Sequence, residues 1–184
     1  MKKVKFLATA ILVTVLFVSC SSDDDTPEPV NEEEVITTLT LTLAPNGGGT
    51  SITLQTQDLD GDGPDAPIIN VSGNLATGVT YNGTLVLLNE TVNPPENITE
   101  EVEEEDLDHQ FFYTLGGGLD VTTAYTNFDS EGNPLGTEFT LTAGEASSGT
   151  LTVTLRHEPT KPNTDLADAG GETDIEATFN VTVQ

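Results

Sequence analysis

The chain has 184 residues, with 31 acidic and only five basic residues, and its formal net charge is −26 at pH 7. Binding of nucleic acid needs a basic surface, so this composition excludes the usual nucleic-acid-binding classes. The length allows one domain with a substantial core. A single cysteine, Cys20, excludes an internal disulfide and any metal site built from several cysteines.

Residues 1–19 have the pattern of a secretory signal peptide. Three lysines precede an apolar stretch over 6–18 that is too short to cross a bilayer. The stretch ends in LFVSC at 16–20, which resembles the lipobox of bacterial lipoproteins. That resemblance implies cleavage before Cys20 and lipidation of its thiol, and two or more acyl chains give stable anchoring. We therefore expect a membrane-anchored lipoprotein.

The next residues, 20–34, read CSSDDDTPEPVNEEE and contain almost no apolar side chain. Like charges, serine and proline favour an extended linker that forms no core. Ser22 to Asp25 resembles the surface-export signal of flavobacterial lipoproteins, which implies an outer-membrane protein that faces the cell exterior. An acidic spacer would carry the same residues. The folded domain is expected over 35–184.

From residue 35 onward, apolar and polar residues alternate with a period of two. Leu39, Leu41 and Leu43 alternate with threonines, which is typical of strands with one buried face. Glycine- and asparagine-rich turns separate the runs. We predict an all-β fold, an immunoglobulin-like antiparallel β-sandwich of about nine strands. The predicted strands are 35–44, 50–57, 67–72, 78–89, 109–115, 119–127, 136–143, 149–158 and 173–183.

Two local patterns add detail to the predicted sandwich. Residues 97–107, NITEEVEEEDL, predict one short helix with Asn97 as its cap and acids in its first turn. Residues 75–81, LATGVTY, resemble the tyrosine corner of immunoglobulin-like and fibronectin type III domains. That resemblance implies a hydrogen bond between the Tyr81 hydroxyl and the nearby backbone.

An aspartate-rich loop is the most specific candidate for metal binding. Residues 58–65, DLDGDGPD, place acids at alternate positions followed by glycine, as in the first half of an EF-hand calcium loop. The bidentate glutamate at the end of such a loop is missing here, and Asp65 is the nearest substitute. The alternative is a polar hairpin turn. The predicted calcium ligands are Asp58, Asp60, Asp62 and Asp65.

The two histidines form a second candidate site. His109 follows an acidic run, and His157 precedes Glu158. Two imidazoles with carboxylates bind zinc, and two histidines can also hold a haem through both axial positions. His109 and His157 each lie near the end of a predicted strand, so they meet only if these strands pair. Two unrelated surface histidines are the alternative.

The motifs of several enzyme classes are absent from the sequence. There is no G-x-S-x-G, no phosphate-binding loop, no H-E-x-x-H and no cysteine nucleophile. The chain also lacks tryptophan, which leaves little for carbohydrate binding by aromatic stacking. We therefore expect a protein that is not an enzyme.

The mature sequence, from SSDDD through NITEEVEEEDLDHQFFY and GTLTVTLRHEP to GGETDIEATFNVTVQ, resembles a family of small flavobacterial lipoproteins. Members are often labelled "type 1 periplasmic binding fold superfamily protein". That label names two α/β lobes, whereas the residue pattern here predicts strands with one short helix. We expect a surface-exposed outer-membrane lipoprotein that acts as a non-enzymatic binding or accessory module, with an outer-membrane receptor as a candidate partner. The alternative is a metal or haem capture lipoprotein that uses His109 and His157.

Overall fold

The computed structural model describes residues 34–61 and 63–184. The predicted signal peptide, Cys20 and most of the predicted linker lie outside this range, and so does Asp62. The described residues belong to one compact unit, which begins at Glu33 and ends at Gln184. Within that range, no helix combines the length and the apolar character that a membrane span requires.

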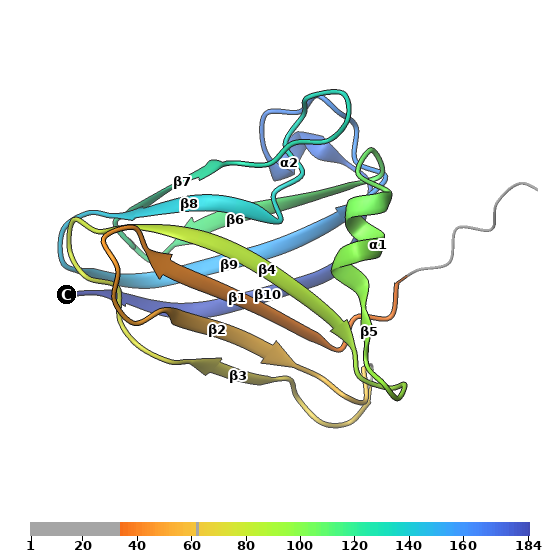
Figure 1. Cartoon of the computed structure of the whole chain (residues 1–184), viewed down its shortest axis with the longest axis horizontal. Helices are drawn as coiled ribbons and strands as arrows, with labels where there is room; N and C mark the ends of the chain where they lie inside the picture. Colours follow the sequence, from red (N-terminus) through yellow and green to blue (C-terminus); the bar gives the residue numbers. More distant parts are fainter. Residues whose placement is uncertain (1–33, 62) are drawn as a thin grey trace, which may run out of the picture. The chain divides into compact units, whose positions relative to one another are not determined.

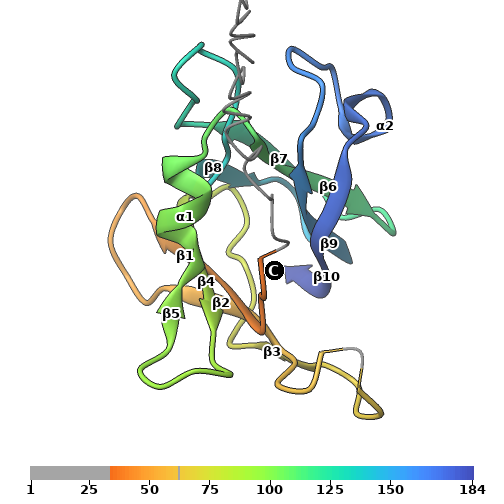
Figure 2. The ribbon, with the colours of Figure 1, turned by 90° about the vertical axis from the view of Figure 1, so that its right-hand side faces the viewer.

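Two antiparallel sheets form a β-sandwich, which confirms the predicted fold class (Figures 1 and 2). The larger sheet has the order β3-β2-β1-β4-β8-β7, with a short β5 beside β4, and the smaller sheet has the order β10-β9-β6. The larger sheet comprises β1 (Thr38–Pro45), β2 (Ile52–Gln57), β3 (Ile68–Val71), β4 (Thr80–Asn89), β5 (Glu96–Asn97), β7 (Val121–Tyr125) and β8 (Glu138–Ala143). The smaller sheet comprises β6 (His109–Gly116), β9 (Ser147–His157) and β10 (Glu172–Val183). Each predicted strand corresponds to one of these strands, and only β5 is additional.

Alternation along the strands places the core between the sheets. Leu39, Leu41 and Leu43 of β1 are fully buried, and they belong to one cluster with Leu151 and Phe179 of the smaller sheet. Burial of each such side chain contributes about 1.5–3 kcal/mol. The threonines between the leucines of β1 face the other way, as the period of two requires.

A short helix, α1 (Ile98–Glu104), follows β5, inside the predicted range of 97–107. Its Ile98 and Val102 side chains are buried in the core, and the backbone N–H of Leu87 donates to Thr99 Oγ1 at 2.8 Å. The predicted cap is only partly right. Asn97 holds the N-cap position, but its side chain donates to Glu100 Oε1 at 2.9 Å and accepts no helix N–H.

A second helix, α2 (Leu166–Ala169), was not predicted from the sequence. It lies in the connection between β9 and β10. Asp165 and Asp168 form a reciprocal capping box around its first turn. A helix of four residues is too short for apolar periodicity to reveal it.

The predicted tyrosine-corner contact is present at the start of β4. The backbone N–H of Ala76 donates to the Tyr81 hydroxyl at 2.8 Å, and the Tyr81 ring is buried in the core. This contact fixes the segment that connects β3 to β4.

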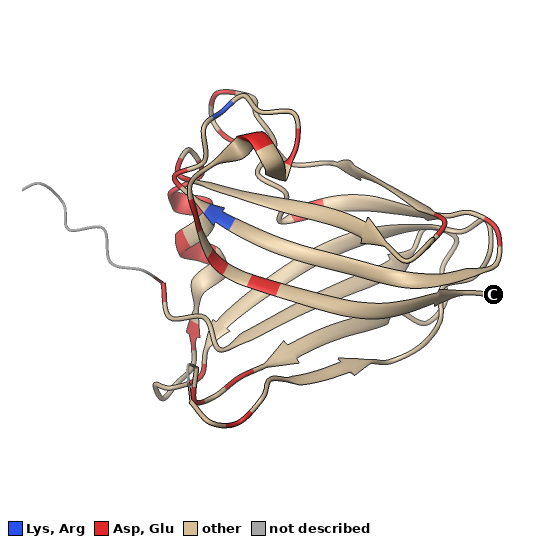
Figure 3. Cartoon of the chain, turned by 180° about the vertical axis from the view of Figure 1, so that it is seen from behind, with Lys and Arg blue, Asp and Glu red and all other residues tan. Residues whose placement is uncertain are grey.

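The two ends of the sandwich differ in charge. One end carries α1, the start of β1 and the β6–β9 pair of His109 and His157. Figure 3 shows that most Asp and Glu residues gather at this end, whereas few lie at the opposite end. The opposite end contains the turn after β1 and the segment before β4, and it carries few acidic side chains.

Candidate metal centre

The two histidines are cross-strand partners. β6 and β9 pair antiparallel, and this register places His109 opposite His157 at the end of the smaller sheet. Their rings are stacked, with centroids 4.8 Å apart and an interplanar angle of 26°. His109 is fully buried and His157 is 6% exposed, so these are not two unrelated surface histidines.

Glu34 brings a carboxylate to this pair from the segment before β1. Its Oε1 lies 2.9 Å from His109 Nε2, and its Oε2 lies 3.8 Å from His157 Nδ1. The Glu34 side chain is only 6% exposed. The residues that follow are fixed by the larger sheet, because the Thr37 N–H donates to the Leu88 carbonyl at 2.9 Å. Glu34, which the sequence assigns to the linker, is therefore part of the folded unit.

Asp174 completes the cluster from β10. The pairing of β10 with β9 shifts between Thr173 and Ile175, so Asp174 is the extra residue of a β-bulge. A bulge redirects a side chain that regular alternation would send outward. Asp174 Oδ1 lies 3.7 Å from His157 Nδ1, and the Asp174 side chain is 2% exposed.

The hydrogen bonding of His109 determines what its second ring nitrogen can do. Nδ1 lies 3.1 Å from the Glu105 carbonyl oxygen, which can only accept, so Nδ1 carries the proton. Nε2 then faces Glu34 in a fully buried position, outside hydrogen-bond geometry. Metal-ligating histidines typically donate their other N–H to a carbonyl or carboxylate in this way.

The charges of the cluster favour a bound cation. Two carboxylates and two imidazoles converge here in a buried position, where a negative charge is costly unless a positive charge lies beside it. Protonation of both imidazoles would instead stack two cations with ring centroids 4.8 Å apart. A divalent ion with two neutral imidazoles and two carboxylates gives a neutral centre, so this donor set suits such an ion.

The spacing of the donor atoms fits zinc. One ligand atom from each of Glu34, His109, His157 and Asp174 lies within 4.8 Å of every other. Ligands bound to one tetrahedral zinc at 2.0–2.2 Å lie roughly 3.4 Å apart. Haem fits poorly, because two axial histidines must point at the iron from opposite faces of a porphyrin. Stacked neighbouring rings leave no room for a porphyrin between them.

A lysine holds the backbone of His109 in place. Lys161 Nζ donates to the carbonyl oxygens of Asp106 at 2.7 Å and His109 at 2.6 Å, and it pairs with Asp129 Oδ2 at 3.0 Å. The Lys161 side chain is 6% exposed, and the Asp129 side chain is fully buried. Burial raises the pKa of Asp129, but hydrogen bonds from Asn133 and from Lys161 lower it more, so the net shift is downward.

A pocket of about 500 Å³ opens beside the cluster. Glu34 and Asp174 both line it, together with Asp58 and Glu176. An acidic pocket raises the local concentration of cations. A cation in this pocket would lie beside Glu34 and Asp174.

The predicted calcium loop contains hydrogen bonds between its aspartates and its own backbone. Asp58 Oδ1 accepts from the Asp60 N–H at 3.3 Å, and Asp60 Oδ2 accepts from the Asp65 N–H at 3.3 Å. Gly61, at the fourth position of the loop, has a positive φ of 58°. Within 34–61 and 63–184, the one group of metal-ligating side chains is the histidine cluster, and Asp62 is not described. Calcium binding by this loop stays a prediction.

The structure corrects the predicted ligand set of the histidine site. Glu158 is exposed, has a positive φ of 48° and is not a member of the cluster. Glu34 and Asp174 take its place, and sequence reasoning missed both. A hairpin between the predicted strands 149–158 and 173–183 is the one signal that would have placed Asp174 near His157. No pattern in the sequence marks Glu34.

A comparison of the chain with protein-family models, with curated proteins and with solved structures found no match.

Proposed function

We propose that this protein is an outer-membrane lipoprotein, exposed at the cell surface, whose β-sandwich binds a divalent transition-metal ion. Zinc is the ion that the donor set suits best. The observation that carries the proposal is the buried group of Glu34, His109, His157 and Asp174. The lipobox at Cys20 and the acidic linker support the location. This is the binding module expected from the sequence, with a metal ion as its ligand.

The donor set supports a role in binding rather than in catalysis. Catalytic zinc sites keep one coordination position open for water or substrate, whereas four protein ligands close a tetrahedral site. This cluster has four donor residues, with side chains between 0% and 7% exposed. Zinc would therefore be held as a captured ion, or it would fix Glu34 to the sandwich.

Calorimetric titration of the full-length protein, purified in detergent and stripped of metal, with ZnCl₂ tests the proposal. We expect one ion per chain, and Co²⁺ at the same site should show the visible absorption of a four-coordinate ion. Glu34→Gln and His157→Gln should each lower the affinity for zinc by about 100-fold or more. Loss of even an outer-shell partner lowers metal affinity 10–100-fold.

Glu158→Gln is the matched control, since it removes an exposed acid next to His157 without touching the cluster. Its zinc affinity should equal that of the wild type. Circular dichroism verifies that each variant is folded. Absence of zinc binding, or equal affinity in folded Glu34→Gln and His157→Gln, would overturn the metal proposal.

The location has its own test. Mass spectrometry of the native protein should find Cys20 as the lipidated N-terminus, and protease added to intact cells should digest the domain. A Cys20→Ala variant should be released from the membrane fraction. An unmodified N-terminal methionine without fatty acid would refute the lipoprotein assignment.

A further inference from the structure

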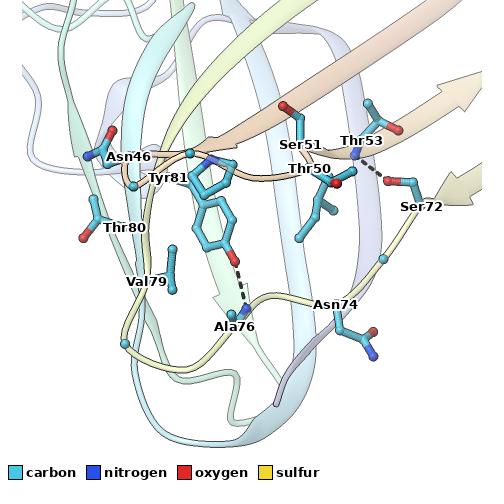
Figure 4. A pocket seen from close by; sticks show the side chains of 16 residues that line it. Asn46, Thr50, Ser51, Thr53, Ser72, Asn74, Ala76, Val79, Thr80 and Tyr81 are labelled. Atoms are coloured by element: carbon cyan, nitrogen blue, oxygen red, sulfur yellow. Dashed lines mark hydrogen bonds between the residues drawn. The ribbon is translucent and has the colours of Figure 1, made fainter.

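A second candidate binding site lies at the end of the sandwich opposite the metal centre. A pocket of about 870 Å³ opens between the β1–β2 turn and the segment that connects β3 to β4 (Figure 4). Its volume falls in the range of small-molecule sites, which is about 300–1,000 Å³.

The lining of this pocket contains no Asp, Glu, His, Lys or Arg. Asparagine, serine and threonine side chains surround it, although the whole chain has a net charge of −26. Apolar side chains of Ile52, Val79 and the Tyr81 ring form part of its wall. Because no lining group compensates a charge and the rest of the protein repels anions, a neutral ligand fits this pocket best.

Several backbone N–H groups of the pocket already have partners within the protein. The Asn46 N–H donates to the Thr80 carbonyl, the Thr53 N–H donates to Ser72 Oγ, and the Ala76 N–H donates to the Tyr81 hydroxyl. Figure 4 shows the last two of these contacts. An extended peptide that adds to a sheet edge needs free backbone groups, and these three N–H groups are not available to it.

Side chains instead supply the groups that are available to a ligand. Among the described residues, Asn46, Thr50, Ser51 and Asn74 make no side-chain hydrogen bond to the protein, and all four are exposed. Hydroxyl and amide groups both donate and accept, which matches a ligand rich in hydroxyl groups. Val79, which is only partly buried, provides an apolar contact for the C–H face of a sugar ring.

From these observations we infer that the pocket between the β1–β2 turn and residues 72–80 binds a neutral saccharide. Recognition rests on side-chain hydroxyl and amide groups, and it does not require the aromatic platform that the chain lacks. The site is independent of the proposed metal centre, since the two share no residue.

The test is a titration of the full-length protein, followed by NMR and calorimetry, with neutral tetrasaccharides of glucose, mannose and xylose. A tetrasaccharide of galacturonic acid serves as the anionic comparison. We expect at least one neutral oligosaccharide to bind and the uronic acid to fail. Thr50→Arg, which puts a long charged side chain into the pocket, should abolish binding. Asn74→Ala should weaken it by about fivefold, the equivalent of one hydrogen bond.

Thr122→Arg is the matched control, because it makes the same change at an exposed threonine of β7, outside the pocket. It should bind the saccharide like the wild type, and zinc binding should be equal in all these variants. Absence of binding to every neutral saccharide, equal binding of the uronic acid, or unchanged binding in Thr50→Arg would overturn the inference.

Discussion

Replacement of Lys161 by methionine tests how the buried ion pair supports the metal end of the sandwich. Lys161→Met keeps the length of the side chain but removes an ammonium group that makes three hydrogen bonds of 2.6–3.0 Å. It also leaves the fully buried Asp129 carboxylate without its cation. Loss of one partner of a buried pair typically costs about 3–5 kcal/mol. We expect a loss in this range, which is a large share of an ordinary domain stability of roughly 5–15 kcal/mol.

The stability loss of Lys161→Met should depend on pH in a direction that follows from the pKa of Asp129. In the wild type the pKa of Asp129 is lowered, so its stabilising contribution is present above the unfolded-state pKa and is lost as the pH falls through the folded-state value. In Lys161→Met the ammonium no longer lowers this pKa, and protonation relieves a buried unpaired charge. The difference in unfolding free energy between wild type and variant should therefore narrow below about pH 4.

Urea unfolding at pH 7 and at acidic pH measures both quantities. Asp129→Asn combined with Lys161→Met is the control, because the neutral amide removes the buried charge and should recover part of the lost stability. A loss smaller than about 1 kcal/mol, the size of an exposed pair, would refute this reasoning. A difference that stays constant on acidification would refute it as well.

Two further predictions concern the metal centre and the tyrosine contact. Zinc at 100 times its dissociation constant should raise the unfolding free energy by about 2.7 kcal/mol, which corresponds to roughly 5–11 °C in the melting temperature of a domain of this size. Scanning calorimetry should find no such shift in Glu34→Gln. A shift in that variant would contradict the ligand assignment. Acidification should release the ion, because protons compete for the imidazole nitrogens. Tyr81→Phe removes the acceptor of the Ala76 N–H and should cost about 0.5–1.5 kcal/mol in urea unfolding; an unchanged midpoint would show that water replaces the hydroxyl.

The sequence determined the strands because alternation is a local property. Leu39, Leu41 and Leu43 can be buried together only if residues 38–45 form a strand with one apolar face. The local pattern of cap and acids identified the short helix after Glu96, and the resemblance to a tyrosine corner implied the contact of Tyr81. The histidines were also recognisable as candidates, because imidazole is a common metal ligand.

Only the tertiary structure decided which groups meet. The register of β6 against β9 places His109 opposite His157, and no residue between them in the sequence specifies that register. Alternation around Ile175 would send Asp174 outward with Glu176, and the bulge at Thr173–Ile175 overrides it. Glu34 lies in a stretch whose composition indicates a linker, yet its carboxylate reaches a strand 75 positions further along the chain. Such contacts depend on strand pairing over long sequence distances, which local patterns do not encode.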